Sequence, residues 1–592
     1  MSKYPPPSKQ AIQTAVRRKT NLLQRMNWLV NSQPQPKLQP KRQDIIPEFS
    51  NSKVYSIIPL NIFQSWCSLD LPPKMKENVE LLKIQNPEFT YYLYDDETSE
   101  QFIRDNFDED VVYSFNKLKP GAYKSDLWRL CILYIKGGIY LDIKYKCING
   151  FKLLSLTDNE YYVSDRLSEG IRGIYNGFIV SMPNNKRLYK GIQQIVENVK
   201  NNIYGYTALF PTGPHSLASF FNAIDVNALK LRFDEIGIIL NNTLILNYYP
   251  EYRSEQQKYG LLKYYKTLWL EKDIYNYPIL TPELSTCYTQ TITKTILNIP
   301  TKLYSGTPCI IAISDTSYLV NLRWVNYKIN PDGSIVDKPK QWISLNSRFI
   351  VDSNFLKISD EIFLEEDFVK EKIYDGIGLE DIRIFNFNNK YYYISTRFDI
   401  NRRLTSTSSD VYTLDETTYT LNRNIILPNT YDLHKFFIYE KNWNFVTLNN
   451  KLCVIYNWFP IQIGEIDYET NRLNITQFKY NIPNFFKDAR GSTGGCIRNN
   501  EIWFVLHKAQ TYFSDNKLCR NYQHFFAVFD SDMNLIRFSE LFKFSNYVIE
   551  FCVGLIVKED SIILSYSLMD TQSMVSVYSI DWIGQQLKWY TE

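Results

Sequence analysis

The spacing of apolar and polar residues divides this chain into two unlike halves. From Val54 to about Tyr288, short apolar runs typical of strands alternate with longer amphipathic stretches typical of helices. The strand-like runs are 54–66, 89–94 and 139–142, and the helical stretches are 73–84, 99–106 and 123–135. Such alternation predicts a three-layer α/β domain with a largely parallel sheet, which we place at residues 49–295.

After about residue 300, short strand-like runs come in pairs separated by Asn, Asp and Gly turns. Pairs that recur roughly every 50 residues are typical of β-propellers rather than sandwiches. The pairs are 383–387 with 391–396, 445–448 with 452–458, 495–498 with 502–507, 525–529 with 535–538, and 553–557 with 562–567. We therefore predict an all-β five-bladed propeller at residues 300–592, after a linker between Thr289 and Ser305.

Composition narrows the function classes. The chain is 44% apolar and carries a net charge of +3, which fits a globular protein and argues against a dedicated nucleic-acid binder. Residues 1–48 are rich in Pro, Gln and basic residues and read as a flexible arm. Nine scattered cysteines, no signal-peptide pattern and no long apolar run predict a soluble, cytoplasmic protein without a membrane span.

The most informative segment is 134–144. An apolar helix ends at Gly137-Gly138, a short strand follows, and Asp142 stands where that strand ends. Ligands of open α/β sheets bind at the carboxyl ends of strands, so Asp142 is expected in a binding site. Nucleotide-sugar sites often use Asp-x-Asp there, with the second Asp on a divalent metal, but this chain has Lys144 at that position.

Two further segments add candidate binding groups. Gln64 and Trp66 end an earlier strand, where Trp66 is either a platform for a nucleotide base or a core residue. Asp126 and Arg129 lie at i and i+3 on one helix face. Alone they would be an ordinary ion pair, but their place one helix before Asp142 favours contact with sugar and phosphate oxygens.

Taken together, these segments resemble the capsular-polysaccharide-type sugar transferases of glycosyltransferase family 32. The resemblance covers about residues 54–225 and rests on four main motifs, with weaker echoes at 176–179 and 212–214. It implies a GT-A fold and transfer from a nucleotide sugar with retention of configuration. The motifs are Ile58-Pro59-x-x-Ile62-Phe63-Gln64-x-Trp66, Asn86-Pro87-Glu88 through Tyr94-Asp95-Asp96, Lys124-Ser125-Asp126-x-x-Arg129 and Gly137-Gly138-Ile139-Tyr140-Leu141-Asp142.

The resemblance also implies roles for individual residues. Asp142 would bind the ribose and the Mn²⁺ or Mg²⁺ region, and the acceptor side would be closed by Thr212, Gly213 and Pro214. Lys144 leaves three interpretations open: it replaces the metal, or Asp142 and other oxygen ligands keep the ion, or the site has decayed. The donor-binding set is Gln64, Trp66, Asp126, Arg129, Tyr140, Asp142 and Lys144.

The second half carries charged residues next to several strands, which in a propeller would face a central pocket. It resembles the five-bladed propellers of glycoside hydrolase family 130, the β-mannoside phosphorylases and related β-1,2-mannosyltransferases, through Gly378-x-Glu380-Asp381-x-Arg383, Glu440-Lys441-Asn442 and Gly494-Gly495. The resemblance implies that Asp381 is a catalytic acid. The remaining pocket residues would be Glu380, Arg383, Lys441, Asn442, Arg490, His507 and Asp570.

The sequence thus predicts a bifunctional carbohydrate enzyme. Its first half would extend a glycan or glycoprotein acceptor from a UDP- or GDP-linked sugar, and its propeller would act on mannosides by transfer or phosphorolysis, with phosphate as a partner in the second case. The alternatives are a single transferase with a glycan-binding propeller, or two scaffold domains of a glycosylation complex. The AT-rich residue usage suggests the cytoplasm of a bacterium or of a cell hosting a large DNA virus.

Overall fold

A computed structural model describes residues 56–591 except 169–170, 236, 261–262, 297, 337–338, 365–375, 399–403, 410–422, 425–440 and 515–516. The described residues belong to one compact unit that spans Lys53–Glu592. The arm predicted for residues 1–48 and the motif residue Glu440 lie outside the described residues. Within the described part of the chain, no helix is both long and apolar enough to cross a bilayer, and all nine cysteines are free thiols.

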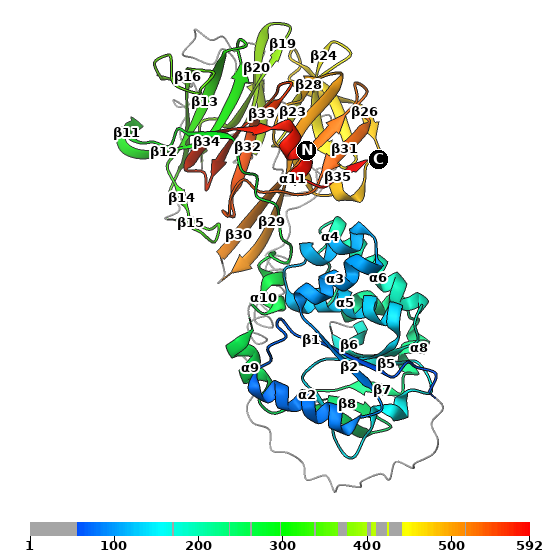
Figure 1. The fold of residues 1–592 in the computed structure, drawn as a ribbon. Helices are drawn as coiled ribbons and strands as arrows, with labels where there is room; N and C mark the ends of the chain where they lie inside the picture. Colours follow the sequence, from blue (N-terminus) through cyan, green and yellow to red (C-terminus); the bar gives the residue numbers. More distant parts are fainter. Residues whose placement is uncertain are drawn as a thin grey trace, which may run out of the picture. The chain divides into compact units, whose positions relative to one another are not determined.

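A nine-stranded sheet forms the centre of the first half (Figure 1). Only β1–β2, β1–β3 and β5–β7 are parallel pairs, and the other five are antiparallel. The strand order is β2 (Thr90–Tyr94), β1 (Asn61–Ser65), β3 (Gly138–Leu141), β6 (Ile171–Ser181), β5 (Tyr161–Ser168), β7 (Leu231–Phe233), β8 (Gly237–Leu240), β9 (Thr243–Tyr248) and β4 (Tyr145–Cys147).

The prediction of a largely parallel sheet is therefore wrong. Parallel neighbours need a crossover of a dozen or more residues, which the helices after β1 and β2 provide. The later strands follow one another through short turns, as in β5–β6 and β7–β8–β9, and a short turn permits only antiparallel pairing.

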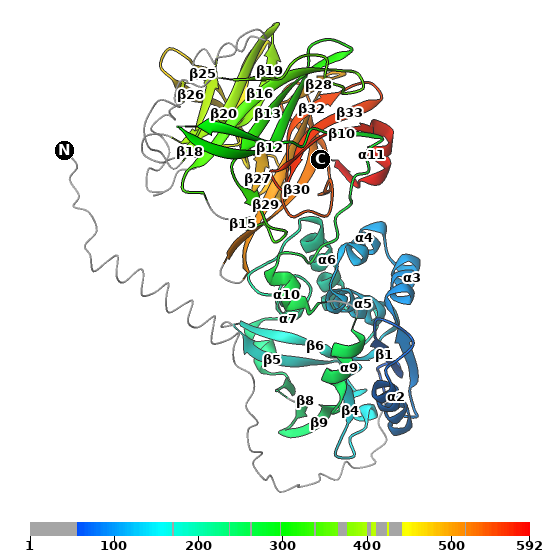
Figure 2. The same ribbon diagram turned by 90° about the vertical axis from the view of Figure 1, so that its left-hand side faces the viewer.

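Helices pack on both faces of this sheet (Figures 1 and 2). Phe63 and Tyr140 face a core shared with α3, α4, α5 and α6, whereas their neighbours Ile62 and Ile139 face a second core that includes Leu82 of α2. This alternation is the period of two expected along a strand. The helices are α2 (Pro73–Gln85), α3 (Asp96–Asn106), α4 (Glu109–Lys117), α5 (Gly121–Lys136), α6 (Lys186–Lys200), α7 (Pro214–Ala218), α8 (Ala223–Asn227), α9 (Tyr252–Tyr259) and α10 (Tyr265–Leu270).

Most of the helices and strands expected before Asp142 form close to their predicted bounds, but α4 was missed. Its sequence is short and contains Val111, Val112 and Tyr113, residues with modest helix propensity. Asp108 starts the helix because its side chain accepts hydrogen bonds from the backbone N–H groups of Asp110 and Val111. An apolar face packed in the core then stabilises the nine residues.

Two glycines fix the entry into β3. Gly137 ends α5 with a φ of 61°, and its N–H bonds to the carbonyl of Leu133. Gly138 follows with a φ of 123°, and a Cβ atom there would lie 2.7 Å from the backbone oxygen of Asn61 on β1. The close approach of β3 to β1 therefore requires glycine, and it aims the end of β3 at the site.

The second half is a β-rich, propeller-like region, and every strand pair predicted for it is formed. Among the described residues its strands make five sheets of four or more strands and one two-stranded sheet of β14 (Lys328–Ile329) and β15 (Ile335–Val336). The first of the larger sheets contains β10 (Leu284–Cys287), β34 (Gln572–Ser579), β33 (Ser561–Leu568) and β32 (Glu550–Val557). The second contains β11 (Thr291–Ile296), β12 (Ile299–Ala312), β13 (Ser317–Val325), β16 (Trp342–Asp352), β17 (Ile362–Phe363) and β18 (Gly376–Ile377).

The other three larger sheets come from consecutive parts of the chain. The last of them also takes in β35 (Trp589–Thr591), which follows the short helix α11 (Ile580–Gln586) near the end of the chain. One contains β19 (Glu380–Phe387), β20 (Lys390–Phe398), β21 (Leu404–Ser409) and β22 (Arg423–Asn424). The next contains β23 (Asn444–Leu448), β24 (Lys451–Trp458), β25 (Ile461–Asp467) and β26 (Arg472–Lys479). The last contains β27 (Ala489–Gly491), β28 (Cys496–Arg498), β29 (Glu501–Ser514), β30 (Lys517–Phe529) and β31 (Leu535–Ser539).

The strand β10 connects the start of the β-rich region to its end. It pairs antiparallel with β34, almost 300 residues later in the chain, while β11 pairs with β12. Both β10 and β11 precede residue 300, where the sequence pattern placed the start of the propeller. Strand sharing between the two ends of a repeated β-structure removes an open sheet edge.

We expect Gly138→Ala to destabilise the protein by about 1–3 kcal/mol, because the added methyl group clashes with the backbone of β1 at an unfavourable φ. Urea unfolding measures the loss. The matched control is Gly121→Ala at the first position of α5, where a Cβ atom meets nothing within 4 Å and alanine favours the helix. Equal stability of the two variants would contradict this account of β3.

Candidate functional site

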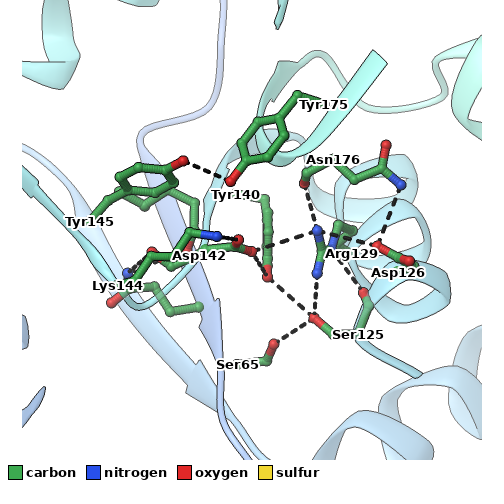
Figure 3. Close-up of polar contacts among 12 residues, drawn as sticks. Ser65, Ser125, Asp126, Arg129, Tyr140, Asp142, Lys144, Tyr145, Tyr175 and Asn176 are labelled. Carbon is green, nitrogen blue, oxygen red and sulfur yellow. Dashed lines mark hydrogen bonds and ion pairs between the residues drawn. The ribbon is translucent and has the colours of Figure 1, made fainter. Parts of the chain in front are cut away.

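The candidate site is a network of charged and hydroxyl side chains at the carboxyl end of β3 (Figure 3). Asp142 follows the last residue of β3, and its N–H bonds to the carbonyl of Gly177 on β6 at 2.9 Å. A Cβ atom at position 177 would lie 2.6 Å from Asp142 Oδ2. Glycine at position 177 therefore leaves the space that the carboxylate occupies, a requirement that sequence reasoning missed.

Lys144 lies beside Asp142, with its Nζ 2.7 Å from Asp142 Oδ2. Three tyrosine rings surround the same ammonium group, those of Tyr145, Tyr175 and Tyr248, with centroids 4.9–5.6 Å from Nζ. The electron-rich faces of aromatic rings attract a cation, so this cage favours a charged lysine at this position.

Arg129 occupies the other side of Asp142. Its Nη1 lies 3.6 Å from Asp142 Oδ1 and 3.4 Å from Asp126 Oδ1. The guanidinium group also donates to the carbonyl of Asn176 at 2.7 Å and to the carbonyl and hydroxyl oxygens of Ser125 at 3.0 and 2.8 Å. Because these bonds use three of its five N–H donors, Arg129 is held rigidly between the two carboxylates.

A chain of hydroxyl groups joins β1 to Asp142. Ser65 Oγ lies 2.8 Å from Ser125 Oγ, which lies 3.2 Å from Tyr140 Oη, and Tyr140 donates to Asp142 Oδ1 at 3.0 Å. Arg129 packs over the ring of Tyr140, 4.3 Å from its centroid. Tyr140 was predicted as a site residue. Ser125 was part of a quoted motif but received no role, and Ser65 was not singled out.

Asp126 is buried, and each of its oxygens has a hydrogen-bond partner. Its Oδ2 accepts a hydrogen bond from Thr212 at 2.8 Å, and its Oδ1 accepts a weaker one from Asn176 at 3.4 Å. Gly213 lies close to the same carboxylate, and Pro214 begins α7. The structure thus brings Thr212, predicted for the acceptor side, into direct contact with Asp126, predicted for the donor side.

The two residues predicted on β1 and after it play different parts. Gln64 is fully buried: its amide donates to the carbonyls of Leu141 and Asp142 at 3.3 and 3.4 Å, and its oxygen accepts from Tyr91 at 2.9 Å. It therefore supports the end of β3. Trp66 is partly exposed and packs against the apolar cluster that contains Met75 and Tyr252. Stacking of a base on Trp66 stays a prediction.

Burial and nearby charges shift the pKa values of Asp126 and Asp142 in opposite directions. Burial raises the pKa of Asp126 above its usual range, although Arg129 and Thr212 act against it. Burial opposes ionisation of Asp142 as well, but the charges of Lys144 and Arg129 outweigh it and hold the pKa of Asp142 below its usual range. Asp142 in turn raises the pKa of Lys144 against the effect of burial. Asp142 and Lys144 are therefore an ion pair at neutral pH.

A divalent metal does not fit the donor atoms present. No group of three or more His, Cys, Asp or Glu side chains in the described part of the chain could hold one. Asp142 has one oxygen on Lys144 and the other on Tyr140, and position 144 supplies a cation where a metal needs an anionic ligand.

A second polar cluster lies in the β-rich half. Arg323 of β13 contacts two of its carboxylates, with Nη1 2.8 Å from Asp381 Oδ1 and Nη2 3.4 Å from Glu380 Oε1. Tyr327 donates to Asp570 Oδ2 at 2.9 Å. Burial is the main cause that raises the pKa of both Glu380 and Asp570. Sequence reasoning found the three carboxylates but missed Arg323 and Tyr327.

Arg383 and its neighbours complete this cluster. Arg383 donates to the carbonyl of Ser492 at 2.6 Å, to the carbonyl of Asp381 at 3.0 Å and to Asn442 Oδ1 at 3.3 Å. Asp381, Asn442 and Asp570 all have φ between 51° and 69°, a backbone region that non-glycine residues adopt rarely and that recurs at functional sites.

The basic side chains predicted for this pocket affect one another's pKa values. His507 is buried and its Nδ1 lies 2.8 Å from Ser492 Oγ. Burial lowers the pKa of His507 most, and the charges of Arg490, Arg383 and Lys441 lower it further. Burial likewise lowers the pKa of Lys441, against the attraction of Glu380 and Asp381. His507 is therefore neutral at neutral pH and lies near the cations Arg383, Lys441 and Arg490.

Residues 72–162, which include Asp126, Arg129, Asp142 and Lys144, match the family model described as the glycosyltransferase sugar-binding region containing DXD motif. This segment is similar to the sugar-binding region of glycosyltransferases. The predicted likeness of the first half to sugar transferases is thereby confirmed. That Lys144 takes the position of the second Asp of the motif stays a prediction.

Curated relatives of the chain include mannosyltransferases. Inositol phosphoceramide mannosyltransferase 2 of Schizosaccharomyces pombe is 28% identical over 163 residues, which cover 27% of this chain and 46% of that protein. An uncharacterised glycosyltransferase of Acanthamoeba polyphaga mimivirus is 31% identical over 134 residues, or 22% of this chain and 51% of that protein. The chain spans about half the length of the curated relatives it matches.

Among solved structures, a β-1,2-mannobiose phosphorylase from Listeria innocua aligns with a TM-score of 0.33 at 12% identity, covering 50% of this chain and 96% of that chain. A GDP-Man-dependent mannosyltransferase from Leishmania mexicana aligns with a TM-score of 0.30 at 13% identity, covering 48% of this chain and 87% of that chain.

The opposite pKa directions of Asp126 and Asp142 predict opposite pH dependences. The stability that Asp126 contributes should fall as the pH rises from its unfolded pKa of about 4, because its folded pKa is raised. The stability that Asp142 contributes should be lost as the pH falls below about 4, because its folded pKa is lowered.

Urea unfolding of the wild type and of Asp126→Asn and Asp142→Asn measures both effects. We expect the stability of the wild type relative to Asp126→Asn to decrease as the pH rises above about 4. Relative to Asp142→Asn, it should decrease only below about pH 4, with slopes of at most about 1.4 kcal/mol per pH unit. Differences that change in the same direction over the same pH range would contradict the assignment.

Proposed function

We propose that the chain transfers mannose from a nucleotide sugar to a glycan acceptor. The contact that carries this proposal is the grouping of Asp126, Arg129, Asp142 and Lys144 at the carboxyl end of β3, within the segment that matches the glycosyltransferase family. The mannosyltransferase relatives support mannose as the donor sugar. We further propose a GT-A-type domain and retention of the anomeric configuration.

In this proposal each charged side chain has a role that its surroundings permit. Asp126 accepts hydrogen bonds from sugar hydroxyls, and its contact with Thr212 ties the acceptor side to the donor sugar. Bonds to two backbone carbonyls fix Arg129. Its guanidinium group in turn holds the carboxylates of Asp126 and Asp142. Negative charge builds on the leaving diphosphate during transfer, and fixed cations that meet it lower the barrier.

Lys144 provides that cation. Its ammonium already neutralises Asp142 and is held by three tyrosine rings, so it presents a positive charge where related sites hold a metal ion. Incoming phosphate oxygens compete with Asp142 for the same ammonium group. We therefore favour donor binding without a metal over retention of Mn²⁺ and over decay of the site.

Metal independence is tested with the full chain and a panel of GDP- and UDP-sugars. We expect sugar transfer to survive EDTA and to fall about 10²–10³-fold in Lys144→Ala, the scale of losing one charge-stabilising group. Lys144→Asp restores Asp-x-Asp and should bind Mn²⁺, which electron paramagnetic resonance detects directly. Lys146→Asp, two residues further along, is the charge-matched control and should gain no Mn²⁺ site. Wild-type activity that EDTA abolishes and Mn²⁺ restores would overturn the proposal.

For the β-rich half we propose a five-bladed propeller that begins before Leu284 and acts on mannosides. The five sheets of four or more strands and the pairing of β10 with β34 support the architecture. The cluster of Arg323, Glu380, Asp381 and Asp570 supports a site that takes a sugar, and the cations around His507 suit a phosphate or a second sugar. The rival proposal is a propeller that binds glycans without reacting.

Asp381→Asn separates these two proposals. If the propeller is catalytic, the wild-type chain should cleave or transfer mannosides, with or without phosphate. The rate should fall at least about 10²-fold in Asp381→Asn, the scale of general acid catalysis. Product analysis by mass spectrometry provides the measurement. Asp532→Asn, on an exposed turn of the same half, is the control. Mannoside binding without turnover in the wild type would favour the binding module.

A further inference from the structure

Two exposed tyrosines lie beside the acceptor side of the candidate site. Tyr206 is 52% exposed and Tyr264 is 54% exposed. Exposed aromatic residues that stand alone need no explanation, whereas these two belong to one packed cluster. We call this cluster the aromatic platform and define it by Tyr206, His215, Tyr264 and Tyr265.

The ring of Tyr206 is held in place by its neighbours. It stacks on the buried imidazole of His215, with 5.9 Å between centroids and 20° between planes, and it contacts Phe210 at 4.8 Å. His215 is fixed in turn, because its Nδ1 lies 2.8 Å from Thr207 Oγ1 and its N–H bonds to the carbonyl of Leu209. A half-exposed ring that is already fixed loses little conformational entropy when a ligand stacks on it.

The loop of Tyr206 is joined to the start of α10 through a buried tyrosine. Tyr123 donates to the carbonyl of Ala208 at 2.6 Å, and its ring contacts that of Tyr265 at 5.7 Å. Tyr265 in turn packs on Tyr264, with centroids 4.5 Å apart. The two exposed rings therefore belong to one connected structure.

The platform borders the carboxylate of Asp126. Thr212, in the same loop as the first exposed tyrosine, donates to Asp126 at 2.8 Å. Burial and Tyr264 raise the pKa of Tyr265 most. The charges of Asp126 and Asp165 raise it further, so the Tyr265 hydroxyl lies within electrostatic range of both carboxylates.

Asp165, on β5, adds a second carboxylate to this border. Its side chain is mostly buried, its Oδ1 accepts the N–H of Arg166 at 2.7 Å, and within the described part of the chain it forms no salt bridge. Burial raises the pKa of Asp165, although Arg166 and Lys144 act against it. Carboxylates accept hydrogen bonds from hydroxyl groups and repel anions, so this border favours a neutral ligand over a phosphorylated one.

We propose that the aromatic platform binds a neutral sugar ring of the acceptor, with Tyr206 stacking on the ring and Asp165 accepting a hydrogen bond from one of its hydroxyl groups. Aromatic rings pack against the apolar face of a sugar, and a few polar groups then fix its orientation. The inference rests on the proposed function of the chain as a sugar transferase. It specifies the acceptor as an uncharged glycan and makes Tyr206 and Asp165 the residues that select it.

Transfer kinetics of the full chain with GDP- and UDP-sugars test the role of Tyr206. The neutral acceptors are methyl α-mannoside, maltose and lactose. Tyr206→Ala should raise the acceptor KM about tenfold or more, the factor for one lost stacking contact, and should change the donor KM far less. Tyr206→Phe keeps the ring and should keep the acceptor KM. Tyr259→Ala, which removes a 40% exposed tyrosine of α9 outside the platform, is the matched control.

A comparison of neutral with phosphorylated acceptors tests the role of Asp165. The wild type should prefer methyl α-mannoside to mannose 6-phosphate in kcat/KM. Asp165→Asn should reduce that preference about fivefold, because the repulsion between the carboxylate and the phosphate is lost. Thermal melting of each variant shows whether it is folded.

The outcomes separate this inference from the proposed function. Transfer with an acceptor KM that neither Tyr206→Ala nor Asp165→Asn changes, or a preference for phosphorylated acceptors, would overturn the platform and leave the transferase proposal standing. If no sugar is transferred, saturation-transfer NMR with the same neutral sugars, in the presence of GDP or UDP, provides the second measurement. Sugar signals that Tyr206→Ala reduces would then support the platform and count against transfer alone. The absence of such signals would overturn the platform as well.

Discussion

The ion pair between Lys144 and Asp142 is the contact on which the geometry of the candidate site depends. A carboxylate at the end of β3 is partly withdrawn from water and close to a second buried carboxylate, Asp126, so it needs a positive charge nearby. Arg129 supplies part of that charge but is committed to backbone carbonyls. The ammonium of Lys144 therefore completes the balance from within the chain, and the tyrosine cage fixes its position.

This charge balance also explains the packing around the site. Gly177 has no side chain because Asp142 occupies that space, and Gly138 lets β3 approach β1 closely enough for Gln64 to bond to the end of β3. The hydroxyl chain from Ser65 to Tyr140 then fixes the second oxygen of Asp142. Each of these contacts restricts the carboxylate to one orientation, which is the condition for a preorganised electrostatic site.

The sequence predicted the parts of this site that depend on local pattern. Asp126 and Arg129 follow from helical spacing, and Asp142 follows from a glycine turn and a short strand. Thr212 and Asn176 contact Asp126 from positions 86 and 50 residues away, and no local pattern records such distances. The antiparallel part of the sheet was missed for a related reason, because strand direction depends on turn length and on strands that are distant in sequence.

In the β-rich half, too, local features were predicted from the sequence and long-range contacts were missed. Its strand pairs were predicted because each is a local hairpin, whereas Arg323 contacts Asp381 across 58 residues and Tyr327 contacts Asp570 across 243. The pairing of β10 with β34 likewise joins residues almost 300 positions apart, which no local pattern records. A buried arginine is costly unless its carboxylate partners are buried beside it, as Glu380 and Asp381 are beside Arg323. Arg323 therefore belongs to the cluster, although it lies outside every motif found in the sequence.

A second buried ion pair links residues of α4 to the C-terminal part of the chain. Lys117 lies 2.7 Å from Glu540, and both side chains are almost fully buried. Tyr113 donates to the same carboxylate at 2.8 Å, and Asp110 pairs with Lys588. These three residues lie at i, i+3 and i+7 on one face of α4, so only one alignment of the helix satisfies all of them. An unpaired charge at this depth would be costly. The N–H of Asn276 bonds to the carbonyl of Lys117 and the N–H of Lys119 to that of Ile274, so the same alignment also positions the segment that contains Ile274 and Asn276.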